Sequence, residues 1–239
     1  VPFAPRTFWF SYPDYVELSK LAGAVVDLFA ASRAGLVLGA SGARNQIIRE
    51  IKNKTVVGSD AEQLNGHLVT GTYFSALGGK AQLGRTLTPE DDRVSGAHPV
   101  VVLSHRFWRR RFGGEGNVIG RTIRLNTIQF TVLGIAADGF MGVTSLVGPD
   151  VWLPSMMALS VVPRESANWL DDRSAMAFTG AARLKPGVTL AQAQMQASVV
   201  ARALERYGEN EARTFLLANN GTPPISLRPN PRHPALADL

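Results

Sequence analysis

The chain contains no cysteine among its 239 residues. That absence excludes disulfide bridges, thiolate metal sites and cysteine nucleophiles. The sequence also lacks any run of roughly eighteen uninterrupted apolar residues, which a membrane-spanning helix needs. The nearest approach, residues 25–40, is interrupted by Asp27 and Arg33. Hydrophobic residues still make up 45% of the chain, so we expect a packed, soluble fold and not a disordered tail.

Motifs for nucleotide binding and for hydrolase chemistry are missing as well. Gly78-Gly79-Lys80 lacks the preceding glycine spacing of a Walker loop, so the domain is not expected to bind ATP. The segment 39–42, GASG, misses the last glycine of a GxSxG nucleophile elbow by one place. Ser104 precedes His105, but sequence neighbours do not form a catalytic pair by themselves, and helix capping explains the serine.

The polar residues do not show metal-ligand spacing either. The acidic run 90–92 lacks the ligand alternation of an EF-hand, and behind Thr88-Pro89 it predicts a capped turn. The histidines are scattered, with no partner at a spacing such as HExxH: His67, His98, His105 and His233. We therefore predict no catalytic, cofactor-binding or metal-ligating residues and no cofactor.

The charge balance of the chain is compatible with several classes of partner. The formal net charge is +6, from 25 Lys or Arg against 19 Asp or Glu, which permits nucleic acid, anionic lipid or no particular partner. Arg109-Arg110-Arg111 beside Trp108 and Phe112 is the strongest pattern for nucleic-acid binding, since cations hold phosphates and aromatic rings stack on bases. We interpret the aromatics as core residues and the arginines as solvated, and expect no nucleic acid.

The middle of the chain predicts a dense succession of short elements. A strand over 99–104 precedes a helix over 105–112, with Ser104 as N-cap and Gly113 and Gly114 as left-handed stops. Two strands over 121–125 and 129–135 should pair as a hairpin across a turn near Asn126, although the usual Asn-Gly pair is absent.

The flanking segments predict an α+β layer. A helix should begin after Ser11, with Pro13 in its first turn, and end before Gly23. The helix in the last third should begin with a capping box of Thr189 and Gln192 and continue to Gly208. Further strands are expected over 25–31, 35–38, 64–72, 177–184, 214–217 and 225–227, with a mobile tail from 229. Residues 46–54 are ambiguous, because their isoleucines fit one helical face but Asn53 and Lys54 weaken that pattern.

Ten short motifs follow one another over about ninety residues: Tyr73-Phe74, Leu77-Gly78, Leu83-Gly84-Arg85, Pro89-Glu90-Asp91-Asp92, Val101-Val102-Leu103-Ser104, Phe107-Trp108, Phe112-Gly113, Gly120-Arg121, Thr131-Val132-Leu133-Gly134 and Val151-Trp152-Leu153-Pro154. In this order they resemble the MacB-like periplasmic core domain of FtsX-like, MacB-type ABC transporter permeases. The opening Phe10-Ser11-Tyr12-Pro13-Asp14-Tyr15 looks like the start of large, duplicated permeases of this group.

The resemblance implies a fold and a division of the chain. It implies a discontinuous porter-like α/β-sandwich subdomain with an inserted, mostly β, Sabre-like subdomain. The porter-like part would take residues 1–72 and 156–239, and the insert residues 73–155. These divisions fall close to the three blocks that the predicted elements form.

The resemblance also implies a function. It indicates the extracytoplasmic loop of a permease on the bacterial inner membrane, not an enzyme, that transmits ATP-driven conformational change to export a substrate or to act on an envelope partner. The implied partners are the membrane-embedded remainder of the permease, a separate ABC ATPase subunit and a periplasmic adaptor or envelope protein, with a dimer in the full transporter. The opening Val1-Pro2-Phe3, without Met or a signal peptide, is expected of a fragment cut from a larger protein.

A second interpretation stays open from the residues alone. A stand-alone basic binding module for an envelope protein, an anionic lipid or a nucleic acid would also have this charge and no catalytic motif. Apolar segments of about twenty residues on both sides of the fragment would favour the permease loop over this alternative.

Overall fold

The computed structural model describes residues 9–39, 50–51, 54–55, 62–143, 147–162 and 169–196. The chain forms two compact units, of which unit 1 comprises residues 1–30, 76–78 and 169–239, and unit 2 comprises residues 31–75 and 79–168. Both units combine helices with strands, which confirms the expected α+β class. Over the described ranges, no helix is long and apolar enough to cross a membrane.

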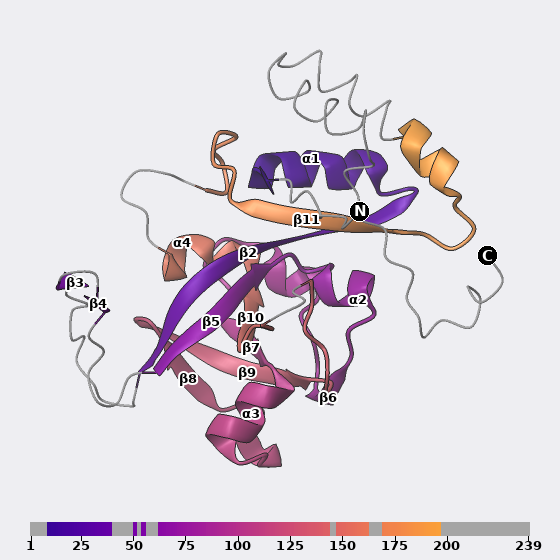
Figure 1. Ribbon diagram of the computed structural model, residues 1–239. Coiled ribbons are helices and arrows are strands. Elements are labelled where there is room, and N and C mark those ends of the chain that lie inside the picture. Colours follow the sequence, from indigo (N-terminus) through magenta and orange to yellow (C-terminus); the bar gives the residue numbers. More distant parts are fainter. Residues whose placement is uncertain are drawn as a thin grey trace, which may run out of the picture. The chain divides into compact units, whose positions relative to one another are not determined.

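Unit 1 pairs a helix with a small sheet. Its strands are β1 (Trp9–Phe10), β11 (Phe178–Leu184) and the first residues of β2 (Val26–Gly39), in the order β1-β11-β2. Helix α1 (Tyr12–Ala22) begins as predicted, because the Ser11 hydroxyl accepts a hydrogen bond from the backbone N–H of Asp14 at 3.3 Å. The Tyr12 ring packs on Phe178 at 5.8 Å between ring centroids, which holds α1 on β11 (Figure 1).

The start of the predicted last helix is confirmed over residues 190–196. The Gln192 side chain accepts from the backbone N–H of Thr189 at 2.8 Å, and the Thr189 hydroxyl accepts from the N–H of Gln192 at 3.3 Å. Ala193 is buried as expected, but Leu190 is 44% exposed. Leu190 lies outside the small apolar cluster to which Ala193 belongs. The other members of that cluster are Val26, Ala182, Ala22, Val25, Leu28, Leu184 and Val188.

Several expectations fall outside the described residues. They are the continuation of the last helix to Gly208, the strands over 214–217 and 225–227, the tail from 229, and His233. Most of the ambiguous segment 46–54 and of the near-miss motif 39–42 is outside as well. The described residues in and next to segment 46–54 form two short strands, β3 (Glu50–Ile51) and β4 (Lys54–Thr55), which pair with each other in antiparallel orientation.

Unit 2 is built on strands that close into a ring. Each strand in the order β2-β5-β10-β7-β9 is hydrogen-bonded to the next, and β8 pairs with both β9 and β2, which completes the ring; β6 pairs with β9 outside it. Figure 1 shows β8 and β9 below β2 and β5. The bounds are β5 (Glu62–Val69), β6 (Ala81–Gly84), β7 (Val100–Leu103), β8 (Thr122–Leu125), β9 (Ile128–Ala136) and β10 (Val151–Pro154).

Alternation along these strands fills the ring with apolar side chains. Side chains of directly paired residues lie on the same face of a sheet, and successive residues point to opposite faces. On β2, Ala34, Leu36 and Leu38 are buried, while Arg33 and Gly35, which alternate with them, are exposed. The paired residues that share the buried inner face include Leu36, Leu64, Leu38, Leu125, Ile123, Phe130, Leu103, Val151, Leu153 and Leu68.

Strands from the first block of the sequence belong to this ring. β5 pairs with β10 in parallel, with Leu68 opposite Leu153, and β2 pairs with β8, with Leu38 opposite Leu125. Segments expected in the first porter-like piece therefore share a sheet with segments of the expected insert. The two strands predicted over 25–31 and 35–38 are one continuous strand, because extended backbone continues without a break through Gly35.

Short helices connect the strands of unit 2. They are α2 (Tyr73–Leu77, of which the first three residues belong to unit 2), the 3-10 helices η1 (Pro89–Asp92), η2 (Gly116–Val118) and η3 (Ser155–Met157), α3 (His105–Phe112) and α4 (Ala158–Val161). Helix α3 has the predicted bounds: the Ser104 hydroxyl accepts from the N–H of Phe107 at 3.1 Å, and Gly113 ends the helix at φ 63°.

The predicted hairpin between β8 and β9 is confirmed, with a two-residue turn. Asn126 takes the left-handed conformation at φ 54° in place of the glycine that such turns prefer. Its side-chain oxygen accepts from the N–H of Val37 at 2.9 Å, and its amide donates to the carbonyl of Val161 at 2.8 Å. The asparagine therefore ties the hairpin turn to β2 and to the end of α4.

A matched pair of glycine substitutions tests the inner packing of the ring. A Cβ on Gly66 would come within 2.4 Å of the Leu36 side chain, while a Cβ on Gly35 of the neighbouring strand would meet nothing within 4 Å. Gly66→Ala should destabilise the protein by about 1–3 kcal/mol through overpacking, and Gly35→Ala should be neutral or slightly stabilising. Chemical denaturation of both variants measures the difference; equal stabilities would contradict the assigned inner face.

Candidate functional site

The acidic run at residues 90–92 forms the predicted capped turn. The Asp91 carboxylate accepts from the N–H of Thr88 at 2.9 Å and from the Arg85 guanidinium at 2.6 and 2.8 Å, which makes a bidentate ion pair. Burial alone would raise the pKa of Asp91, but the hydrogen bonds from Arg85 and Thr88 outweigh it and hold the pKa below its ordinary value. Asp91 is therefore a structural anchor of η1.

Its neighbour Asp92 anchors a different part of unit 2. The Asp92 carboxylate accepts from the N–H of Gly71 at 3.0 Å, from the Ser155 hydroxyl at 2.8 Å and from the N–H of Met156 at 2.8 Å. Burial raises its pKa to about 6, against those hydrogen bonds, which lower it. The two carboxylates thus have separate partners, and no cluster of potential metal ligands occurs in the described part of the chain.

Ser104 and His105 have separate tasks. The Ser104 hydroxyl caps α3, as expected, whereas His105 Nδ1 lies 2.9 Å from the Asp138 carboxylate. The serine hydroxyl accepts from the backbone, and the imidazole contacts a different residue. The pair therefore does not have the geometry of a nucleophile and its base.

His67 is buried on β5 with no hydrogen-bond partner for either ring nitrogen among the described residues. It lies between Arg33 on β2 and Trp152 on β10, the residues directly paired with it. Burial, and after it the positive charge of Arg33, lower its pKa to about 4. This histidine is therefore neutral at ordinary pH.

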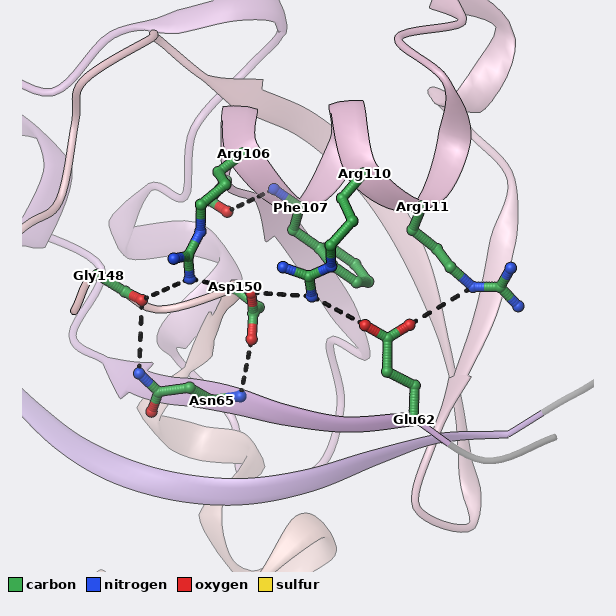
Figure 2. A network of polar contacts seen from close by, with 9 residues as sticks. Glu62, Asn65, Arg106, Phe107, Arg110, Arg111, Gly148 and Asp150 are labelled. Atoms are coloured by element: carbon green, nitrogen blue, oxygen red, sulfur yellow. Dashed lines mark hydrogen bonds and ion pairs between the residues drawn. The ribbon is translucent and has the colours of Figure 1, made fainter. Parts of the chain in front are cut away.

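A polar network of unit 2 joins α3 to β5 and to the segment before β10 (Figure 2). Arg106 and Arg110 both reach the Asp150 carboxylate, at 3.4 and 3.3 Å. Arg110 and Arg111 both reach Glu62, at 2.8 and 3.6 Å. Three guanidinium groups therefore share two carboxylates, and Figure 2 shows the three arginine side chains leaving α3 side by side.

The aromatic residues of α3 lie in the core as predicted. Phe107 and Trp108 are buried, and Phe112 is half-buried against Phe107. The arginines at 109–111 are exposed, as expected. Arg110 and Arg111 in addition form ion pairs, and Arg110 lies over the Phe107 ring at 5.4 Å.

Asp150 is the fixed point of the network. It is only 6% exposed and accepts from the backbone N–H of Asn65 on β5 at 3.0 Å, which leaves its other oxygen for Arg106 and Arg110. Asp150 and Glu62 did not emerge from the sequence as partners of the arginines. They lie 40 to 48 positions from Arg110, and no local pattern predicts that contact.

A shallow groove of about 360 Å³ opens beyond Arg111. It is lined by the ends of β2 and α3, by β8 and by the start of β9, with the residues Leu38, Gly39, Arg111, Phe112, Thr122, Ile123, Arg124 and Gln129. Arg124 and Gln129 are directly paired across the hairpin, so their side chains share one face. The described lining combines cationic and neutral polar residues with apolar ones.

A family model described as the MacB-like periplasmic core domain matches residues 6–199. The chain belongs to this family. The match covers both compact units of the described structure and includes the network and the groove.

Curated relatives of this MacB-like domain are much longer proteins. The macrolide export ATP-binding/permease protein MacB of Escherichia coli (strain K12) is 29% identical over 184 residues, which are 77% of this chain and 25% of that protein. The protein of the same name from Shigella dysenteriae serotype 1 matches with the same identity and coverage. The chain therefore spans a quarter of the length of these relatives.

Solved structures share the fold of the MacB-like domain. The periplasmic region of MacB from Actinobacillus actinomycetemcomitans superposes with a TM-score of 0.56 at 17% identity, covering 91% of this chain and 86% of the other. The extracellular domain of the noncanonic ABC-type transporter YknZ from Gram-positive bacteria gives 0.53 at 12% identity, covering 86% and 87%. At these identities the likeness concerns the fold alone.

Replacing Asp150 tests which carboxylate carries the network. In Asp150→Asn, an amide N–H₂ must face either the guanidinium groups or the N–H of Asn65, so we expect a loss of about 1–3 kcal/mol of unfolding free energy. Glu62→Gln, at the exposed side of the same network, should cost about 0.5 kcal/mol or less. Urea denaturation compares the two, and a larger cost for Glu62→Gln would refute this ranking.

His67 predicts a pH dependence with a defined sign. Its pKa is about 4 in the folded protein and 6.5 when unfolded, so its contribution to stability is complete above pH 6.5 and is lost as the pH falls through 4. Relative to His67→Phe, the unmodified chain should lose about 3 kcal/mol of unfolding free energy between pH 7 and 4.

The comparison of the unmodified chain with His67→Phe is needed because Asp92 changes the unfolding free energy in the opposite direction as the pH falls. Its raised pKa stabilises the folded state as the pH falls from 6 toward 3.8, and this contribution cancels between the unmodified chain and the His67→Phe variant. Parallel stability curves for the two proteins from pH 7 to 4 would show that His67 titrates normally in the fold.

Proposed function

We propose that this chain is the extracytoplasmic domain of an ABC transporter permease on the outer face of the bacterial inner membrane. The observation that carries the proposal is the family match over residues 6–199. It is supported by the curated relatives, which are named macrolide export ATP-binding/permease proteins. Because the chain spans a quarter of their length, membrane-spanning and nucleotide-binding parts belong outside residues 1–239 in this proposal.

In this role the domain performs no chemical step and transmits conformational change. ATP hydrolysis takes place in a separate nucleotide-binding subunit or domain, and movement of the extracytoplasmic domain exports a substrate or acts on an envelope partner. Such a device requires compact units whose arrangements differ by only a few kcal/mol. The two compact units support this role, and the carboxylates of Asp91, Asp92 and Asp150 have structural partners within unit 2.

The proposal includes partners and a division of the domain. The partners are the membrane-embedded remainder of the permease, the ABC ATPase, a periplasmic adaptor or envelope protein, and a second copy in a dimeric transporter. The division keeps residues 1–72 and 156–239 as porter-like segments and 73–155 as the Sabre-like insert. The pairing of β5 with β10 and of β2 with β8 then joins the two subdomains through shared strands.

Spin labels on the intact transporter test the transmission of movement. The 239 residues contain no cysteine, so labels at introduced cysteines are unambiguous within the domain. Val94 in unit 2 and Met195 in unit 1 are exposed positions. With Val94→Cys and Met195→Cys, replacing ADP by a non-hydrolysable ATP analogue should shift the interspin distance by on the order of 5 Å.

A matched pair within one unit is the control. Val94→Cys with Val147→Cys, both exposed and both in unit 2, should keep its distance in either nucleotide state. Unchanged distances for both pairs would contradict the transmission role. The location is checked on intact spheroplasts, where Val94→Cys should react with a membrane-impermeant maleimide; reaction only after lysis would refute the extracytoplasmic placement.

A further inference from the structure

We infer that the arginine row of α3 (Arg106, Arg110 and Arg111), together with the groove beyond Arg111, is a docking surface for an acidic segment of a partner protein. This inference concerns one face of unit 2 and does not rest on the proposed transport function. It starts from the charge of that face and from the recess next to it. The partner is defined here by its chemistry, which is a polypeptide segment that carries clustered Asp or Glu side chains.

The arginine row holds more cationic capacity than its own carboxylates use. Each guanidinium has five N–H donors, whereas Asp150 and Glu62 together are shared by the whole row. The three side chains remain 60%, 46% and 52% exposed in spite of these ion pairs. Free donors on exposed, oriented guanidinium groups are suited to bind further carboxylates in bidentate geometry.

The groove extends this surface with a second cationic wall. Arg111 belongs to both the row and the groove, and Arg124 lines the other side without an ion pair to any described carboxylate. Among the described residues, the lining includes no acidic one, and Thr122 and Gln129 add neutral hydrogen-bonding groups. An acidic side chain that enters the recess therefore meets cationic and polar groups, and the Glu62 carboxylate beside the recess is already paired with Arg111 at 3.6 Å.

The two acidic residues of the row give it a fixed geometry. Asp150 is held by the backbone of Asn65, and Glu62 projects from β5, so both carboxylates are set by the strand ring. The two carboxylates hold the guanidinium groups of Arg106, Arg110 and Arg111 in a row, as Figure 2 shows. A preorganised row loses less side-chain entropy on binding than free arginines would.

The shape of the surface favours a polypeptide over a nucleic acid or a membrane. Single-stranded nucleic acid is held by exposed aromatic rings, but Phe107 and Trp108 of α3 are buried in the core, and Phe112, which lines the groove, is half-buried against Phe107. A bilayer presents a broad surface that rests on projecting cations, while Arg111 and Arg124 here line a recess. A peptide chain can place single carboxylates into the recess and along the row.

Peptide binding by the whole 239-residue chain tests the inference. The probe is a fluorescein-labelled octaglutamate peptide, with octaglutamine as its neutral counterpart, followed by fluorescence anisotropy at low salt. We expect octaglutamate to bind and octaglutamine not to bind. Arg111→Gln and Arg124→Gln together should weaken the affinity for octaglutamate by roughly tenfold or more, because charge-assisted hydrogen bonds are lost.

The charge control removes one arginine outside the groove, and it is matched to Arg124→Gln, which also removes one positive charge. Arg93→Gln removes an exposed arginine that follows η1 and does not line the groove, so it should change the affinity less than twofold. Arg124→Gln alone removes no ion pair with a described residue and is the variant least able to disturb the fold. Circular dichroism confirms that each variant folds before its affinity is compared.

Three results would overturn the inference. They are no binding of octaglutamate at low salt, binding that Arg111→Gln and Arg124→Gln leave unchanged, and tighter binding of another polyanion at the same arginines. The last is measured with a labelled 20-nucleotide single-stranded DNA and with vesicles that contain phosphatidylglycerol. Failure here leaves the maleimide and spin-label tests of the transport role untouched, so the two proposals fail separately.

Discussion

Closure of the strand ring in unit 2 is the constraint on which the described structure depends. The ring closes through a short contact between β2 and β8, in which Leu38 faces Leu125 and Gly39 faces Arg124. Because side chains alternate between the two faces, a shift of one residue there would turn the inner leucines outward and Arg124 inward. Asn126 secures this register, since its side chain bonds to β2 next to the same contact.

The features that depend on neighbouring residues were predictable from the sequence. The caps at Ser11, Ser104 and Thr189 and the capped turn after Thr88 depend on side chains that bond to backbone three residues away. Such local interactions can be identified from residue type and spacing. The same reasoning predicted the hairpin of β8 and β9, although Asn126 and not glycine supplies the left-handed turn.

The features that depend on distant pairing were not predictable. Leu68 lies opposite Leu153, 85 residues further along the chain, and nothing in either segment specifies that partner. The arginines of α3 illustrate the same limit, because their carboxylates come from β5 and from the residue before β10. Their sequence predicts exposed cations, and only the ring brings Glu62 and Asp150 beneath them.

The dependence on distant strand pairing also explains why the arginines of this cationic face have fixed positions. Asp150 is held by Asn65 within the ring, so the positions of Arg106 and Arg110 follow from strand register and not from the arginines' own flexible chains. Arg124 likewise projects from β8, whose register Leu38 and Leu125 set. A surface whose charges are positioned by a packed core moves as one body with that core. A partner bound to it would therefore experience any displacement of unit 2 directly.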